Sequence, residues 1–119
     1  MSSQPEQLRG RTKAFALRVI RLYQSPPYKT DCQVLGKQLL RCGTSVAANY
    51  RAVCRARSKA EFVAKMGIVV EEADEAVLWL ELMTESGVVS LDKAESLLKE
   101  ANELTAIFPA SQRTARSVA

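Results

Sequence analysis

The feature that most constrains this chain is a helix start signal followed by a long apolar repeat. Ser58-Lys59-Ala60-Glu61 has the S-x-x-E form of a capping box, in which serine and glutamate satisfy free amides of the first helical turn. Gly87 is a natural C-terminal stop. A helix from Ser58 to Ser86 spans about 40 Å at ~1.5 Å per residue, enough to anchor a helical bundle. Its core-facing repeat comprises Phe62, Met66, Val69, Ala73, Ala76, Leu80 and Met83.

Two amphipathic helices are predicted before this one. The first has Pro5 in its first turn, where proline is tolerated, and ends before Ser25-Pro26-Pro27 because proline lacks an amide donor. The second begins at Thr30 or Asp31, either of which can cap it, and ends near Arg57. The apolar faces comprise Leu8, Thr12, Phe15, Val19 and Leu22 in the first helix, and Leu35, Leu39, Cys42, Val46, Asn49 and Val53 in the second.

Two glycines lie inside the second predicted helix. Gly36 and Gly43 share one flank with Ala47 and Cys54. A glycine within a helix costs ~1 kcal/mol relative to alanine. Two on one face therefore indicate either a closely packed neighbouring helix or sites where glycine is simply tolerated.

A fourth helix completes the predicted fold. Ser90 caps it, and Pro109 is expected to end it. Its stripe comprises Leu91, Ala94, Leu98, Ala101, Thr105 and Phe108. Short connections between amphipathic helices favour up-and-down packing. The sequence thus predicts an all-α, antiparallel up-and-down four-helix bundle over residues 1–109, followed by a disordered tail of small and polar residues over 110–119.

Targeting and redox features predict a cytoplasmic protein. No apolar run approaches the ~20 residues that span a bilayer, so no membrane association is expected. Met1 to Gly10 lacks the apolar stretch of a signal peptide. Cys32, Cys42 and Cys54 are odd in number and widely spaced, which favours reduced packing thiols over disulfides.

The chain contains no histidine, which removes the usual base and the usual metal ligand of enzymes. Four acidic residues crowd the third helix, namely Glu71, Glu72, Asp74 and Glu75. A di-iron bundle site needs Glu-x-x-His motifs, so ion pairs with basic residues are the preferred interpretation. We therefore predict no catalytic residues, no metal and no cofactor, and a protein that is not an enzyme.

The net charge of +4 conceals a strong asymmetry. Residues 1–65 carry 13 Lys and Arg against three acids, whereas residues 66–119 carry four against ten. A basic stripe without aromatic residues lies opposite the apolar face of the second helix: Lys37, Arg41, Arg51 and Arg55. Arg18 and Arg21 of the first helix are candidates to widen it, together with Arg9, Arg11 and Lys13. The stripe is either an ordinary solvent-exposed helix face or a surface that binds nucleic-acid phosphates.

Two further groups of residues are predicted to be structural. Asn49 lies in the apolar face of the second helix with Ser45 one turn earlier, and without a base nearby they favour a register-setting polar pair over catalysis. Ile68, Trp79 and Leu82 form a second apolar patch on the third helix. The patch indicates a homo-oligomer interface, or else a helix buried on two sides within one subunit.

The stretch from Leu39 to Met83 resembles the four helix bundle protein family. The matching features are Arg41, Ser45-Val46-Ala47-Ala48-Asn49, Ala56-Arg57-Ser58, Glu61-Phe62, Glu71-Glu72-Ala73-Asp74-Glu75 and Trp79-Leu80-Glu81-Leu82. That family includes proteins encoded within intervening sequences of bacterial large-subunit ribosomal RNA genes. The chain is also similar to the accessory variability determinant of diversity-generating retroelements.

The resemblance implies an antiparallel four-helix bundle assembled as a homopentamer. In the retroelement relatives a basic surface contacts a reverse transcriptase and RNA. In the commoner family pattern a glycine follows an acidic residue soon after the asparagine, whereas this chain has Arg51-Ala52-Val53-Cys54 there. Contacts of that segment are therefore not carried over.

Three hypotheses follow. The first is a non-enzymatic oligomeric adaptor that binds RNA, DNA or a nucleic-acid enzyme through the basic stripe. The second is a purely structural or protein-interaction oligomer whose basic half meets the acidic half of a neighbour. The third, and least favoured, is a small enzyme or metal carrier.

Overall fold

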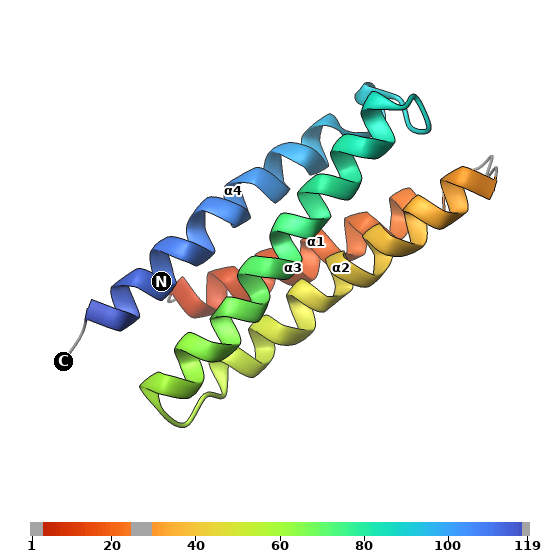
Figure 1. Cartoon of the computed structure of the whole chain (residues 1–119). Helices are drawn as coiled ribbons and strands as arrows, with labels where there is room; N and C mark the ends of the chain where they lie inside the picture. Colours follow the sequence, from red (N-terminus) through yellow and green to blue (C-terminus); the bar gives the residue numbers. More distant parts are fainter. Residues whose placement is uncertain (1–3, 25–29, 118–119) are drawn as a thin grey trace.

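Four antiparallel α-helices form an elongated bundle (Figure 1). The computed structural model describes residues 4–24 and 30–117, except the side chains of residues 30–32. The helices are α1 (Gln4–Tyr23), α2 (Thr30–Cys54), α3 (Lys59–Glu85) and α4 (Leu91–Ser117). Each packs against its neighbours in sequence, and a smaller contact between α1 and α4 closes the bundle. The predicted all-α, up-and-down four-helix bundle is confirmed.

The ends of α3 follow from local chemistry. Ser58 is extended, with φ of −150°, and its Oγ accepts a hydrogen bond from the Glu61 amide at 3.0 Å. At the other end Gly87 has φ of +80°, a left-handed conformation that glycine adopts without a Cβ clash. The Val89 amide then donates to the Met83 carbonyl at 3.0 Å, which satisfies a free helix-end group. The predicted helix from Ser58 to Ser86 is therefore confirmed.

The core lies along the bundle axis and draws on all four helices. Six of the seven predicted α3 positions are fully buried, and only Phe62 is half-buried. Thr12 is buried on α1, where its hydroxyl donates to the Arg9 carbonyl at 3.0 Å. On α4 the buried leucines are Leu97 and Leu104 rather than the predicted Leu98, so that stripe is rotated from the expected one.

No helix among the described residues is both long enough and apolar enough to cross a membrane.

Gly43 marks the closest approach of α1 and α2. A Cβ built on Gly43 would lie 2.8 Å from Cγ2 and 3.1 Å from Cβ of Val19, which is fully buried. Valine is stiff about χ1, so it cannot swing aside. Of the two interpretations of the glycines in α2, a closely packed neighbour is therefore the correct one at Gly43.

Gly43→Ala is expected to lower the free energy of unfolding by about 1 to 2 kcal/mol, because overpacking exceeds the gain in helix propensity. Gly10→Ala is the matched control, since a Cβ there meets nothing within 4 Å. It is expected to be neutral or stabilising by up to about 1 kcal/mol. Val19→Ala should relieve the cost of Gly43→Ala in a double-mutant cycle measured by urea denaturation. Equal stabilisation by both glycine substitutions would contradict this packing.

The predicted end of the fourth helix at Pro109 is wrong. The helix α4 continues through Pro109 to Ser117, so residues 110–117 are helical and do not form the expected disordered tail. Proline removes one helical hydrogen bond, but contacts with α3 offset that loss. Gln112 Nε2 donates to the Val63 carbonyl at 2.9 Å, and a Cβ on Gly67 would lie only 3.3 Å from the same nitrogen.

Two other predicted boundaries need comment. The second helix ends at Cys54, three residues before the predicted Arg57, in a turn where the Arg55 amide donates to the Ala52 carbonyl. The stop at residues 25–27 lies outside the described residues, as do the side chains of Thr30, Asp31 and Cys32. Figure 1 shows that the end of α1 and the start of α2 lie at the same end of the bundle.

Candidate functional site

The predicted basic stripe is exposed along α2, but its members have different surroundings. Arg41 bridges to α3: its Nη1 lies 3.3 Å from Glu72 Oε2 and its Nη2 lies 3.4 Å from Glu75 Oε2. Lys37 lies one turn before it. Arg51 and Arg55 lie about 15 Å or more further along the helix, at ~1.5 Å per residue. Arg41 is therefore part of a contact between helices, while Arg51 and Arg55 belong to another surface.

The Arg41 contact includes a buried thiol. Cys42 Sγ, Glu72 and Glu75 present ligand atoms that lie within 4.8 Å of one another. Burial raises the pKa of the Cys42 thiol to about 11; the two carboxylates add to this, and Arg41 opposes it. A thiol protonated at neutral pH is a poor metal ligand. The guanidinium beside it already compensates the carboxylates, so this cluster is best described as an ion-pair network.

A second set of arginines is engaged by α4. Arg11 donates to both carboxylate oxygens of Glu100, at 2.6 and 3.1 Å, and lies 3.6 Å from Glu103. The hydrogen bond from Arg11 lowers the pKa of Glu100. Basic residues of the first half of the sequence thus meet acidic residues of the second half within one chain. The ion pairs predicted for the acidic residues of the third helix thus form within one chain for Glu72 and Glu75.

Arg18 and Arg21 do not extend the α2 stripe. Arg18 donates to Ser96 Oγ at 2.8 Å, and both arginines line a groove between α1 and α4 with Leu22, Lys93 and Leu97. Because that groove is formed with α4 rather than α2, the structure does not bring Arg18 and Arg21 together with Arg51 and Arg55.

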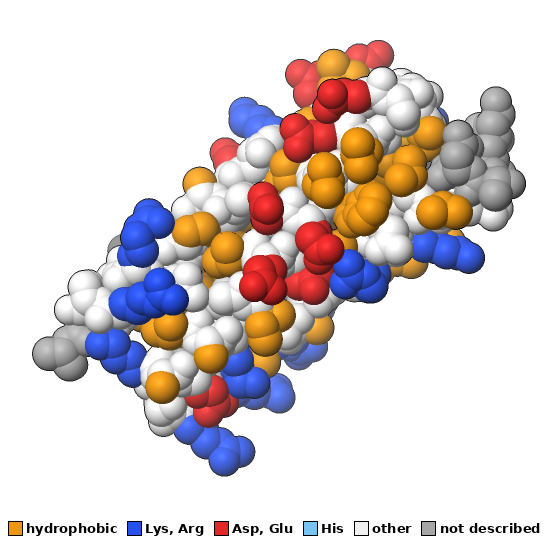
Figure 2. All heavy atoms as spheres, in the orientation of Figure 1, with side chains coloured by type: hydrophobic (Ala, Val, Ile, Leu, Met, Phe, Trp, Pro, Cys, Tyr) orange, Lys and Arg blue, Asp and Glu red, His pale blue; other side chains and the backbone are white. Residues whose placement is uncertain are grey.

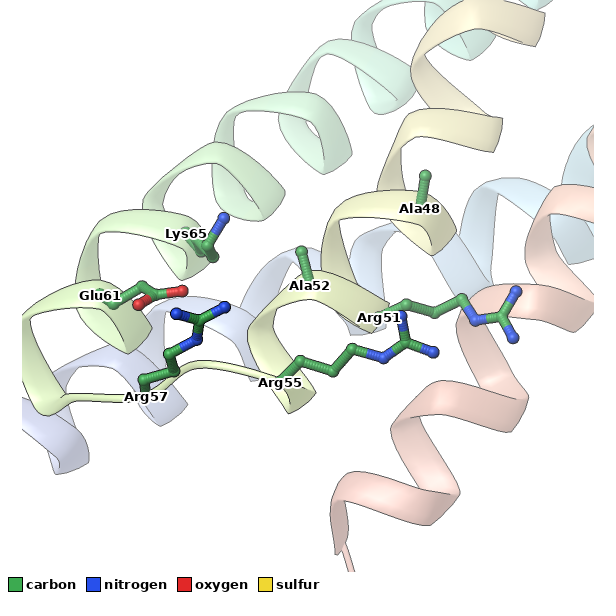
Figure 3. Close-up of a pocket in the computed structure, with 7 residues that line it drawn as sticks. All are labelled: Ala48, Arg51, Ala52, Arg55, Arg57, Glu61 and Lys65. Atoms are coloured by element: carbon green, nitrogen blue, oxygen red, sulfur yellow. The ribbon is translucent and has the colours of Figure 1, made fainter.

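Four cations surround one shallow pocket where α2 turns into α3 (Figure 3). Arg51 and Arg55 come from α2, Arg57 from the connection, and Lys65 from the first turns of α3. Ala48, Ala52 and Glu61 complete the lining of this basic pocket, which has a volume of about 530 Å³. None of the four cations makes an ion pair with a described residue. With four cations and one carboxylate in its lining, this pocket carries a net positive charge.

A neighbouring pocket lies between α1 and α2. Its lining comprises Glu6, Arg9, Gly10, Lys13, Ala47, Ala48 and Arg51. Arg51 and Ala48 line both pockets, so the two adjoin across α2. Arg57 and Lys65 are absent from the predicted stripe because a single-helix projection cannot show what neighbouring elements contribute. The sequence signal that could have identified Arg57 and Lys65 was the capping box, because it places Arg57 and the start of α3 beside the end of α2.

The predicted polar pair forms within α2 rather than between helices. Asn49 Nδ2 donates to Ser45 Oγ at 2.8 Å and to the Ser45 carbonyl at 2.9 Å. Both residues are half-buried, and Tyr50 occupies the adjacent core position. The contact stabilises the Asn49 rotamer.

The second apolar patch is present on the outer face of α3. Ile68 is 44% exposed and Leu82 is 42% exposed, and Leu78 joins them at 48%. Trp79 packs against the core but is not fully buried. The indole N–H of Trp79 is buried and has no well-formed hydrogen bond with a described residue. It lies close enough to the Cys42 thiol to lower the pKa of that thiol slightly. Ile68 lies about 16 Å from Trp79 along α3, at ~1.5 Å per residue.

Figure 2 shows the same face as a surface. Acidic side chains gather along its middle, with hydrophobic side chains and a basic group beside them and further basic side chains nearer the edges. We call Ile68, Leu78, Trp79 and Leu82 the α3 patch. Exposed apolar residues next to charged ones are typical of a subunit interface rim and core, so the patch remains the candidate contact surface.

Comparisons with known proteins point to one group. The family described as 23S rRNA-intervening sequence protein matches residues 7–109. A solved structure, a protein with unknown function from the S23 ribosomal protein family of Bacteroides thetaiotaomicron, superposes with a TM-score of 0.85 at 29% identity. The superposition covers 93% of this chain and 99% of that one. A search of curated proteins finds no match.

Proposed function

Since the chain belongs to the 23S rRNA-intervening sequence protein family, we propose that it is a non-enzymatic, homo-oligomeric bundle that binds nucleic acid through the basic pocket. The single observation that carries this proposal is that Arg51, Arg55, Arg57 and Lys65 line one pocket without acidic partners at ion-pair distance. Phosphate is the ligand that such a group of cations fits best.

The contrast with other arginines of the chain supports this choice. Arg11 and Arg41 carry the same charge, yet each lies against two glutamates of another helix. Those carboxylates neutralise them, so they contribute little to a field for polyanions. Four cations without an ion pair line one pocket at the end of α2, where their charges add. We therefore place the nucleic-acid contact at this end and exclude Arg41 from it.

Oligomerisation is the second part of the proposal. The α3 patch supports it, because three aliphatic side chains and a tryptophan share one outer face. The family resemblance implies a pentamer as its stoichiometry. The competing function, a purely structural or protein-interaction oligomer, shares the α3 patch and differs in having no nucleic-acid affinity at physiological salt.

Arg51→Glu with Arg55→Glu is expected to weaken binding of structured RNA or DNA by at least about tenfold, and to reduce the salt dependence by about 1.4 to 1.8 in slope. The reason is the loss of two phosphate contacts. Lys93→Glu with Lys99→Glu is the matched control, because it makes the same charge change at exposed sites of α4. Fluorescence anisotropy over about 50 to 200 mM salt measures both. Equal loss in both variants, or no loss in either, would contradict the site.

A further inference from the structure

We propose that the basic pocket and the α1–α2 pocket form one continuous track, along which a single nucleic-acid strand crosses over α2. This inference rests on the proposed function and assigns its ligand class. The two pockets lie on opposite sides of α2 and share Ala48 and Arg51. A ligand that occupies one therefore meets the other at these two residues.

The residues of the track are arranged for a backbone that passes across the helix. Cations stand at both ends, with Arg9 and Lys13 on α1 and Arg57 and Lys65 on the far side. Arg51 lies at the shared point and Arg55 one turn beyond it (Figure 3). Positive charge is thus available to phosphates before, over and after the crossing, as strand-tracking grooves require.

Small side chains form the floor of the track on α2. Ala47 lines the α1–α2 pocket, Ala52 lines the basic pocket, and Ala48 lines both. An alanine leaves the helix surface low and offers no polar group for a base edge. The floor thus admits a sugar-phosphate backbone between the charged side chains, and binding is expected to depend weakly on sequence.

A flexible strand fits this path better than a duplex. An α-helix with its side chains is about 10 to 12 Å across, and the ligand must bend around it to reach both pockets. Duplex DNA has a persistence length of about 50 nm, so bending it over the helix costs free energy that a flexible strand does not lose. A duplex could instead take α2 into its major groove, where Arg51 and Arg55 could contact base edges. The relative affinity for a duplex and a strand therefore decides between the two arrangements.

Each pocket also contains one carboxylate, Glu6 in the α1–α2 pocket and Glu61 in the basic pocket. These groups repel phosphate, so phosphates are expected at the cations and the neutral parts of the strand next to the carboxylates. No aromatic side chain lines either pocket. Base stacking, which dominates many single-strand sites, is therefore not expected to contribute at these two pockets.

Ala48→Leu tests the track without changing any charge. Ala48 is exposed on α2, so a leucine there leaves the fold intact but raises the floor at the shared point. The probe is a labelled, mixed-sequence single-stranded RNA of about 16 nucleotides, the upper site size of common single-strand-binding folds. We expect at least a tenfold loss of affinity. Ala106→Leu, at an exposed alanine of α4, is the matched control and is expected to bind like the wild type.

The outcomes separate the track from the function on which it rests. Arg9→Ala with Lys13→Ala, and Arg57→Ala with Lys65→Ala, should each lower the salt slope by about 1.4 for a single strand. Loss of binding in the Arg51/Arg55 charge reversal but not in Ala48→Leu would overturn the track and leave nucleic-acid binding standing. Tighter binding of a duplex of the same sequence than of the strand would also overturn the track. No loss in any of these variants would overturn both.

Discussion

Phe108→Ala is expected to lower the free energy of unfolding by about 3 to 5 kcal/mol, the largest stability effect we predict for this chain. The Phe108 side chain is fully buried in α4, and its ring centroid lies 5.8 Å from that of Tyr50 on α2 at an interplanar angle of 33°. Truncation removes this contact and leaves a cavity between helices. Single domains are stable by only about 5 to 15 kcal/mol, so a large part of the total would be lost.

The measurement is urea denaturation followed by circular dichroism at fixed protein concentration. Leu91→Ala serves as the control, since that side chain is 55% exposed at the start of the same helix. Its effect should stay within about 0.5 kcal/mol. Phe108→Leu should fall between the two. A cost below about 1 kcal/mol for Phe108→Ala would show that the end of α4 does not dock on the core as described.

Leu78→Glu with Leu82→Glu is expected to dissociate the proposed assembly into monomers. Both side chains are nearly half exposed in the single subunit, so glutamate is tolerated in the monomer. Burying an unpaired charge in an interface costs several kcal/mol, and the acidic residues already on this face increase the repulsion. Multi-angle light scattering gives the mass of each species directly.

The control for dissociation is Leu91→Glu, which changes an exposed leucine on α4 away from the α3 patch. It should keep the wild-type mass. Trp79→Ala is expected to dissociate the proposed assembly as well, but Trp79 also packs against the core, so circular dichroism must accompany that variant. Full mass in the Leu78/Leu82 variant would place the subunit contact elsewhere.

Much of the fold was predictable because its signals are local. The Ser58 cap, the α3 repeat and Gly87 each act within a few residues of where they lie, and the structure places α3 within one residue of the prediction. Pro109 shows where local rules fail. The proline favours a helix end, yet Gln112 reaches the Val63 carbonyl 49 positions earlier in the chain. A local sequence pattern cannot predict a contact between residues so far apart in the chain.

The candidate site was only partly predictable for the same reason. Arg51 and Arg55 follow from the projection of α2, but the projection also includes Arg41, which α3 neutralises. It excludes Arg57 and Lys65, which other elements bring to the pocket. Charge on one helix is a property of its sequence, whereas charge available to a ligand depends on which neighbours supply counter-ions.

The position of Trp79 has a consequence for how the protein can be observed. It is the chain's single tryptophan, and it is the member of the α3 patch that also packs against the buried core. Its emission therefore arises from one boundary of the molecule, with no background from other indoles. Dilution that separates subunits would hydrate this ring and shift its emission to longer wavelength. The protein thus carries an intrinsic optical reporter at the surface where assembly is proposed.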